Sequence, residues 1–189
     1  VSAHKIYGPK GVGVLALRSG TPIQALQHGG GQERGRRPGT ENIAGVVGFG
    51  AAADLLPRWR DSERVRQAAL RDDFVAELAR RVPGTQLNGD PVDRLPGNAN
   101  IAFPTGDAET LLLALDMLGI AASAGSACAA GSLEPSHVLL ATGMGMARAR
   151  RSLRFSLGRS TTREDLDQVI SALVGRLAGD PGARRAPLA

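Results

Sequence analysis

The N-terminal segment of the chain places a hydroxyl, an imidazole and an amine within four positions, at Ser2, His4 and Lys5. Lys5 and Lys10 are the only lysines among 23 basic residues, so arginine serves almost everywhere else. A lysine amine can condense with an aldehyde and carry a proton, which a guanidinium cannot do. We interpret Lys5 as the residue that condenses with an aldehyde cofactor, with Ser2 and His4 holding its phosphate. The alternative is an ordinary surface lysine on a polar arm.

The single cysteine, Cys128, lies in a segment of small residues, 122–132. Such a segment can be mobile and present a thiol to solvent, and the thiolate form of cysteine is a nucleophile. The alternative is a buried thiol that serves as a small apolar side chain, which is the commoner state of free cysteine. We interpret Cys128 as reactive, because no bulky neighbour is present to bury it.

Two further segments carry features of anion binding. The glycine-rich loop 29–40 leads into Thr40, which we expect at the N-terminus of a helix, where backbone amides favour negative charge. The whole net charge of +5 lies within residues 1–40, which suits a phosphate. Arg154 sits inside the alternating segment 152–157, from which it could hold a carboxylate by two parallel hydrogen bonds. The alternatives are a flexible surface loop and a solvated arginine face.

Composition restricts the class of protein. The chain of 189 residues is 42% hydrophobic and 22% charged, which argues against wholesale disorder. It has no apolar run long enough for a membrane span and does not begin like a signal peptide. We therefore expect a cytoplasmic protein. Aromatic residues are only 3%, which disfavours nucleic-acid binding, and the three histidines lack metal-ligand spacing, so no metal is expected.

The pattern of apolar and capping residues predicts alternating elements. We expect a buried strand over 12–17, a helix from 41 that Pro57 kinks or ends at about 56, and a second helix over 61–82. Strands are predicted over 98–103, 120–124 and 152–157. A helix capped by Asp107 and a short helix after Pro135 are also predicted. Thr161 and Glu164 are expected to form the capping box of a last helix with a clear apolar stripe.

Four stretches taken together resemble one family. They are SAHKIYGPKG at 2–11, HGGGQERGRRPGTEN at 28–42, SAGSACAAGSLEPSHVL at 123–139 and LRFSLGR at 153–159. They stand in the order found in cysteine desulfurases of the long-loop, housekeeping and nitrogen-fixation branch, which belong with the class V aminotransferases. The resemblance covers about residues 2–175 and corresponds to about the C-terminal half of a family member.

This resemblance implies the C-terminal part of an α/β, fold-type-I transferase that uses pyridoxal 5'-phosphate. Residues 1–56 would then belong to the large cofactor-binding domain, 57–97 to an interdomain helix and connection, and 98–189 to a small α+β domain. By position, Lys5 matches the lysine that binds the cofactor covalently, and Ser2 and His4 match residues near its phosphate. Thr40 matches a residue that reaches the phosphate of the neighbouring subunit in a homodimer.

The resemblance also implies a reaction. Cys128 matches the cysteine that takes sulfur from L-cysteine as a persulfide, releasing L-alanine, and Arg154 matches the arginine that binds the substrate carboxylate. The family passes this sulfur to iron–sulfur scaffolds and other acceptor proteins. The alternatives are another class V aminotransferase, a selenocysteine lyase, or a non-catalytic protein that docks to sulfur acceptors. Family ligands that precede the lysine are missing here, so we expect this chain alone to bind the cofactor weakly and to turn over little.

Overall fold

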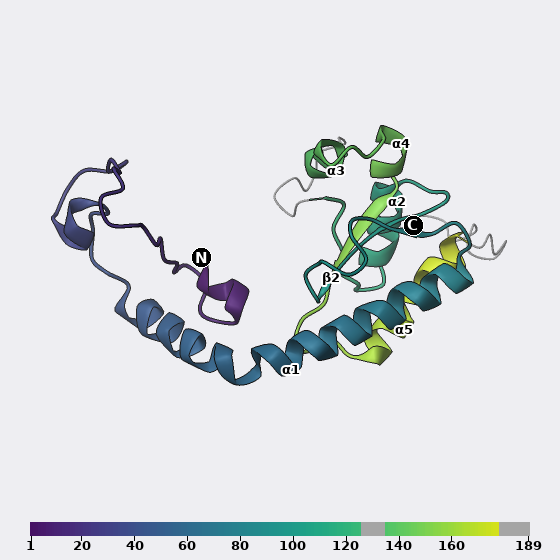
Figure 1. Ribbon diagram of the computed structural model, residues 1–189, viewed down its shortest axis with the longest axis horizontal. Coiled ribbons are helices and arrows are strands. Elements are labelled where there is room, and N and C mark those ends of the chain that lie inside the picture. Colours follow the sequence, from purple (N-terminus) through teal and green to yellow (C-terminus); the bar gives the residue numbers. More distant parts are fainter. Residues whose placement is uncertain (126–134, 178–189) are drawn as a thin grey trace. The chain divides into compact units, whose positions relative to one another are not determined.

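The computed structural model describes residues 1–125 and 135–177, which fall into two compact units that divide between Asp61 and Ser62. The first unit contains two short 3-10 helices, η1 (Ala3–Ile6) and η2 (Gln32–Gly35), and the beginning of the long helix α1 (Ile43–Arg81). The remaining described elements belong to the second unit (Figure 1). The division of the chain at residues 56 and 97 stays a prediction.

The strand expected over 12–17 is absent from the described structure. Its residues form only an isolated bridge between Gly13 and Ser2. Val14 and Leu15 are 54% and 69% exposed, although their types favour a buried strand. A strand needs neighbours that supply ladder hydrogen bonds along its length, and the described part of the first unit offers only this short contact. The prediction was therefore wrong for this structure.

Helix α1 differs from the two helices predicted in its place. It begins at Ile43, not at Glu41, because the side chain of Asn42 accepts a hydrogen bond from the Gly45 amide at 3.0 Å and caps the helix. It also continues through Pro57. A proline inside a helix leaves the carbonyl four residues earlier without its donor. Here that residue, Ala53, is exposed, so water can replace the missing bond.

The second unit is built on a small antiparallel sheet in the order β1 (Gln86–Leu87), β2 (Asn98–Ala102), β3 (Ser152–Ser156). Strands β2 and β3 pair over their full length, with Asn100 opposite Arg154. Because side chains alternate across a strand, the two faces differ. One face is apolar and buried, whereas the other carries Asn100, Ser152 and Arg154. The predicted strands over 98–103 and 152–157 are confirmed.

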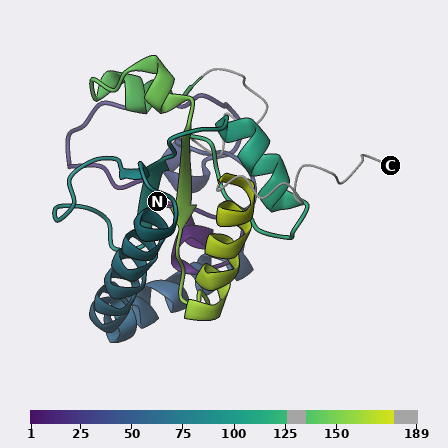
Figure 2. The ribbon, with the colours of Figure 1, turned by 90° about the vertical axis from the view of Figure 1, so that its right-hand side faces the viewer.

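Helices cover the apolar face of this sheet. Helix α5 (Arg163–Leu177) runs alongside β3, with α2 (Ala108–Asp116) next to it (Figure 2). Phe74 of α1 packs edge-on against Phe155 of β3, with ring centroids 5.3 Å apart. The Asp107 side chain accepts a hydrogen bond from the Glu109 amide and caps α2, as predicted. The largest fully buried side chains of the core are Phe74, Leu78, Ile101, Phe103, Leu115, Leu153 and Leu173.

Two short helices, α3 (His137–Ala141) and α4 (Met146–Ala149), lead from the end of the undescribed segment 126–134 to β3. The short helix predicted after Pro135 corresponds to α3. The strand predicted over 120–124 is wrong, because this segment makes only a single bridge, from Ser123 to Arg154. Among the described residues, no helix combines the length and the apolar character required to cross a lipid bilayer.

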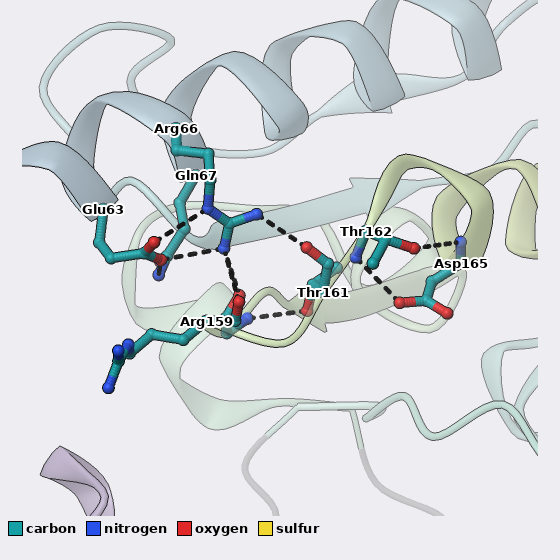
Figure 3. A network of polar contacts seen from close by, with 8 residues as sticks. Glu63, Arg66, Gln67, Arg159, Thr161, Thr162 and Asp165 are labelled. Atoms are coloured by element: carbon teal, nitrogen blue, oxygen red, sulfur yellow. Dashed lines mark hydrogen bonds and ion pairs between the residues drawn. The ribbon is translucent and has the colours of Figure 1, made fainter.

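A polar network joins α1 to the connection between β3 and α5 (Figure 3). The guanidinium of Arg66 donates hydrogen bonds to the carbonyl oxygens of Gly158, Arg159 and Thr161, at 2.9, 3.1 and 2.8 Å. It also pairs with the carboxylate of Glu63 at 2.9 Å. This pairing holds the pKa of the Glu63 carboxyl below its usual range. Arg66 therefore fixes the chain that leaves β3.

The same network shows where α5 begins. The Thr162 hydroxyl accepts a hydrogen bond from the Asp165 amide, and the Asp165 carboxylate accepts one from the Thr162 amide, at 3.2 and 2.9 Å. This reciprocal pair is a capping box one residue later than the predicted pair of Thr161 and Glu164. Thr161 does not cap α5, because its hydroxyl instead accepts a hydrogen bond from the Gly158 amide at 2.9 Å.

Candidate active site

Lys5 lies on η1, a turn that backbone hydrogen bonds hold on both sides. The Ala3 amide donates to the Val12 carbonyl at 3.0 Å, and the Gly8 amide donates to the Ala3 carbonyl at 2.9 Å. Ala3 is completely buried, so the turn is anchored at its start. Lys5 itself is exposed. The arrangement presents the amine on a fixed piece of backbone.

Two neighbours show why the sequence turns tightly here. Tyr7 adopts a left-handed conformation with φ of 67°, which is costly for a residue with a side chain. Its ring packs edge-on against Trp59 at 5.7 Å, and this contact helps to compensate for the strain. At Gly8 a Cβ would lie 3.0 Å from the Cβ of Ala3, so a larger residue would loosen the turn. A glycine after Tyr7 is thus favoured by packing.

The structure places the residues predicted to hold a phosphate on separate segments of the first unit. Ser2 and His4 share the turn with Lys5; Ser2 is half-buried and His4 is exposed. Thr40 is exposed and lies just before α1, where its carbonyl accepts a hydrogen bond from Arg37 at 3.0 Å. Because Asn42 caps α1, the expectation that Thr40 is the cap was wrong. Its predicted reach toward a neighbouring subunit's phosphate stays a prediction.

Arg154 lies in the second unit, on the polar face of the sheet, and its side chain is half-buried. Its Nη2 donates a hydrogen bond to the Ser123 hydroxyl at 3.4 Å. Its Nε is buried and has no acceptor among the described residues. A buried donor without a partner is unfavourable, so this guanidinium is suited to an additional anionic acceptor such as a carboxylate.

Cys128, the predicted nucleophile, lies outside the described residues. The described residues on both sides of it, Ala124 and Gly125 before and Pro135 and Ser136 after, line a hollow of about 270 Å³. The first turn of α2 forms another wall of this hollow. The structure therefore describes the two ends of the cysteine-bearing segment but does not test the position of the thiol.

Sequence reasoning missed Ser123. It makes two backbone hydrogen bonds with Arg154, from Ser123 N to Arg154 O at 3.1 Å and from Arg154 N to Ser123 O at 2.7 Å. Each of the two segments carried a local strand signal, but nothing in either segment indicated that these particular residues pair. The pairing links residues 31 positions apart, which only the folded chain reveals.

The model of the class V aminotransferase family matches residues 1–169, so the chain belongs to this family. Among its relatives, a protein of Dictyoglomus turgidum named cysteine desulfurase IscS is 48% identical over 92% of this chain and 44% of that protein. A protein of Azotobacter vinelandii named cysteine desulfurase NifS is 50% identical over 88% of this chain and 42% of that protein. The resemblance found in the sequence is confirmed.

Solved structures agree with this assignment. A NifS-like protein superposes with a TM-score of 0.81 and 33% identity, covering 94% of this chain and 45% of that chain. DndA from Streptomyces lividans superposes with a TM-score of 0.62 and 36% identity, covering 82% of this chain and 45% of that chain. The predicted α/β fold of the fold-type-I class is confirmed. The chain spans less than half the length of the relatives that it matches.

The side chains on η1 fit the cofactor of this family. Pyridoxal phosphate presents an aldehyde and a phosphate, and the turn carries an exposed amine beside a hydroxyl and an imidazole. The amine of Lys5 suits the aldehyde, and the hydroxyl of Ser2 and the imidazole of His4 suit the phosphate. Among the described residues, the chemistry of this donor set therefore matches the two ends of the cofactor.

Proposed function

We propose that this chain takes part in cysteine desulfuration, the removal of sulfur from L-cysteine to give L-alanine and a persulfide on Cys128. The observation that carries the proposal is the identity of about half the residues with proteins named cysteine desulfurase, across nearly the whole chain. The exposed amine of Lys5 on a fixed turn and the unsatisfied Nε of Arg154 support it independently.

Each residue has a distinct role in this proposal. Lys5 Nζ would hold pyridoxal phosphate covalently and, once the substrate amino group has displaced it, the freed amine would move the α-proton of the substrate, while Ser2 and His4 would bind the phosphate. Arg154 binds the substrate carboxylate and so orients the amino acid. Thr40 reaches the phosphate of a second subunit in a homodimer. When bound, the cofactor supplies an electron sink for negative charge at the substrate α-carbon.

The sulfur transfer balances with only the substrate and Cys128. The thiolate of Cys128 attacks the substrate sulfur, an S–S bond forms, and the C–S bond of the substrate breaks. The electron pair of that C–S bond remains with the substrate β-carbon, which takes up a proton and becomes the methyl group of L-alanine. The sulfur atoms are oxidised to the persulfide level and the carbon is reduced, so no external oxidant or reductant is needed.

The destination of the sulfur and the setting of the protein follow from the same assignment. We propose that an iron–sulfur scaffold or another acceptor protein takes the sulfur from Cys128. We further propose that the protein acts in the cytoplasm as a homodimer, since Thr40 would complete the phosphate site of its partner.

Borohydride reduction of the full chain mixed with pyridoxal phosphate tests the role of Lys5. We expect a mass increase that peptide mapping places on Lys5, and that Lys5→Ala abolishes. Lys10→Ala is the matched control, because Lys10 is also exposed and is the only other lysine. Equal labelling of both lysines would show ordinary surface reactivity and contradict the proposal.

Sulfur transfer is tested by alkylating the chain after incubation with L-cysteine and the cofactor. We expect a persulfide on Cys128 and equimolar L-alanine, and we expect Cys128→Ala to abolish both. An L-cysteine-consuming activity that Cys128→Ala leaves intact would instead favour an aminotransferase. Because the chain spans less than half of its relatives, we expect turnover far below that of a full-length relative.

A further inference from the structure

Ser123 and Arg154 form a pair that joins two distant parts of the second unit. Ser123 follows α2 by several residues and precedes Cys128 by five, whereas Arg154 is the middle residue of β3. Their two backbone hydrogen bonds, at 3.1 and 2.7 Å, make an antiparallel bridge of one residue on each side. The side chains of such a pair project to the same face of the sheet, so the serine hydroxyl lies within reach of the guanidinium.

The backbone of Arg154 is thereby held from both sides. Strand β2 flanks it with Asn100, and Ser123 flanks it on the other edge. Both backbone polar groups of Arg154 point toward Ser123, because they make the two bonds of the bridge. The position of the Arg154 α-carbon is therefore fixed, and only the long side chain keeps rotational freedom.

Within the described residues, the hydroxyl of Ser123 is the one hydrogen-bond acceptor for that side chain. Nη2 donates to Ser123 Oγ at 3.4 Å, while the buried Nε has no acceptor. We infer that Ser123 is a positioning residue, whose hydroxyl holds the guanidinium of Arg154 in the orientation that receives a carboxylate. The inference rests on the proposed function, in which Arg154 binds the carboxylate of the amino-acid substrate.

The inference has a specific physical consequence. A free arginine side chain samples many rotamers, and binding a carboxylate with two parallel hydrogen bonds requires one of them. Removing the hydroxyl of Ser123 leaves the backbone bridge in place but releases the guanidinium. The affinity of Arg154 for a carboxylate should then fall about 3- to 10-fold, because a loss of this size corresponds to the net contribution of about one hydrogen bond. Ligands without a carboxylate should be unaffected.

Nuclear magnetic resonance of the full chain, labelled with nitrogen-15, tests this directly. The Nε–H signal of Arg154 is assigned by its disappearance in Arg154→Lys, and the probes are L-alanine and its neutral-ended analogue L-alaninamide. We expect L-alanine to shift the signal and L-alaninamide to leave it in place. In Ser123→Ala the half-saturating concentration of L-alanine should rise about 3- to 10-fold. Ser123→Thr, which keeps a hydroxyl, should bind as the unmodified chain does.

Ser171→Ala is the matched control, since Ser171 is exposed on α5 and belongs to no proposed site. Unchanged L-alanine affinity in Ser123→Ala would overturn the positioning role while leaving the substrate role of Arg154 intact. If L-alanine leaves the Arg154 signal in place both in the unmodified chain and in every variant that keeps Arg154, the substrate role of Arg154 is refuted. The inference about Ser123, which depends on that role, is then refuted as well. If L-alaninamide shifts the Arg154 signal as L-alanine does, and Ser123→Ala weakens both equally, Ser123 has a merely structural role and the inference is also overturned.

Discussion

Replacing Arg66 by alanine should destabilise the second unit through the connection between β3 and α5. The guanidinium donates to three backbone carbonyls that are more than 90 positions away in sequence. Its side chain is 36% exposed, and that of its partner Glu63 is 18% exposed. The variant would remove these long-range bonds together and leave the partly buried carboxylate of Glu63 without the guanidinium that hydrogen-bonds to it.

The magnitude follows from the number and setting of these bonds. A net hydrogen bond to a charged group contributes about 1.5 to 3 kcal/mol when protected from water. Three bonds that share one guanidinium, itself about a third exposed, are worth much less than their sum, because solvent screens them. We therefore expect Arg66→Ala to lower the free energy of unfolding by about 2 kcal/mol.

Urea denaturation followed by circular dichroism measures this change, and hydrogen exchange of the first amides of α5 locates it. Arg80→Ala is the matched control, since Arg80 pairs with Glu77 at the same spacing on the same helix but, within the described part of the chain, makes no hydrogen bond to a distant carbonyl. We expect the control to shift the urea midpoint far less and to leave the α5 amides protected. Equal losses in the two variants would refute the reasoning.

Two further predictions concern the same unit. Gly97→Ala should lower the urea midpoint, because the added Cβ would lie only 2.6 Å from the backbone oxygen of Leu157 and 2.5 Å from Oε1 of Gln67. An unchanged midpoint would show that the backbone at this position can shift freely. The pKa of the Glu63 carboxyl is lower in the folded chain than its ordinary value of about 4.3, so its ionised form stabilises the fold. This stability is fully present above the ordinary pKa and is lost as the pH falls through the lower pKa of the folded state. Urea midpoints measured between pH 7 and pH 3 should therefore fall less steeply for Glu63→Gln than for the unmodified chain, and parallel curves would contradict this.

Much of the candidate site could be predicted from the sequence, because residue type alone limits the chemistry. Lys5 is one of two lysines and Cys128 is the only thiol, so the choice of candidates did not depend on coordinates. Local elements were predictable for a related reason. The cap of α2 by Asp107 and the apolar stripe of α5 depend on residues only a few positions apart.

The corrections have two sources, a choice between neighbouring capping residues and the lack of a pairing neighbour for a strand-like segment. Thr161 carries a valid capping signal, but its hydroxyl accepts from Gly158, so Thr162 caps α5 instead. Residues 12–17 have the composition of a strand, yet a strand forms only where a neighbour supplies its hydrogen bonds.

What the sequence by itself determined is therefore the set of candidate reactive groups, the helices whose caps and apolar faces are local, and the family. Only the tertiary structure decided that Ser123 meets Arg154 and that Arg66 holds the chain after β3. These contacts join segments 31 to 95 positions apart. No local pattern encodes them, because each depends on how the whole unit packs.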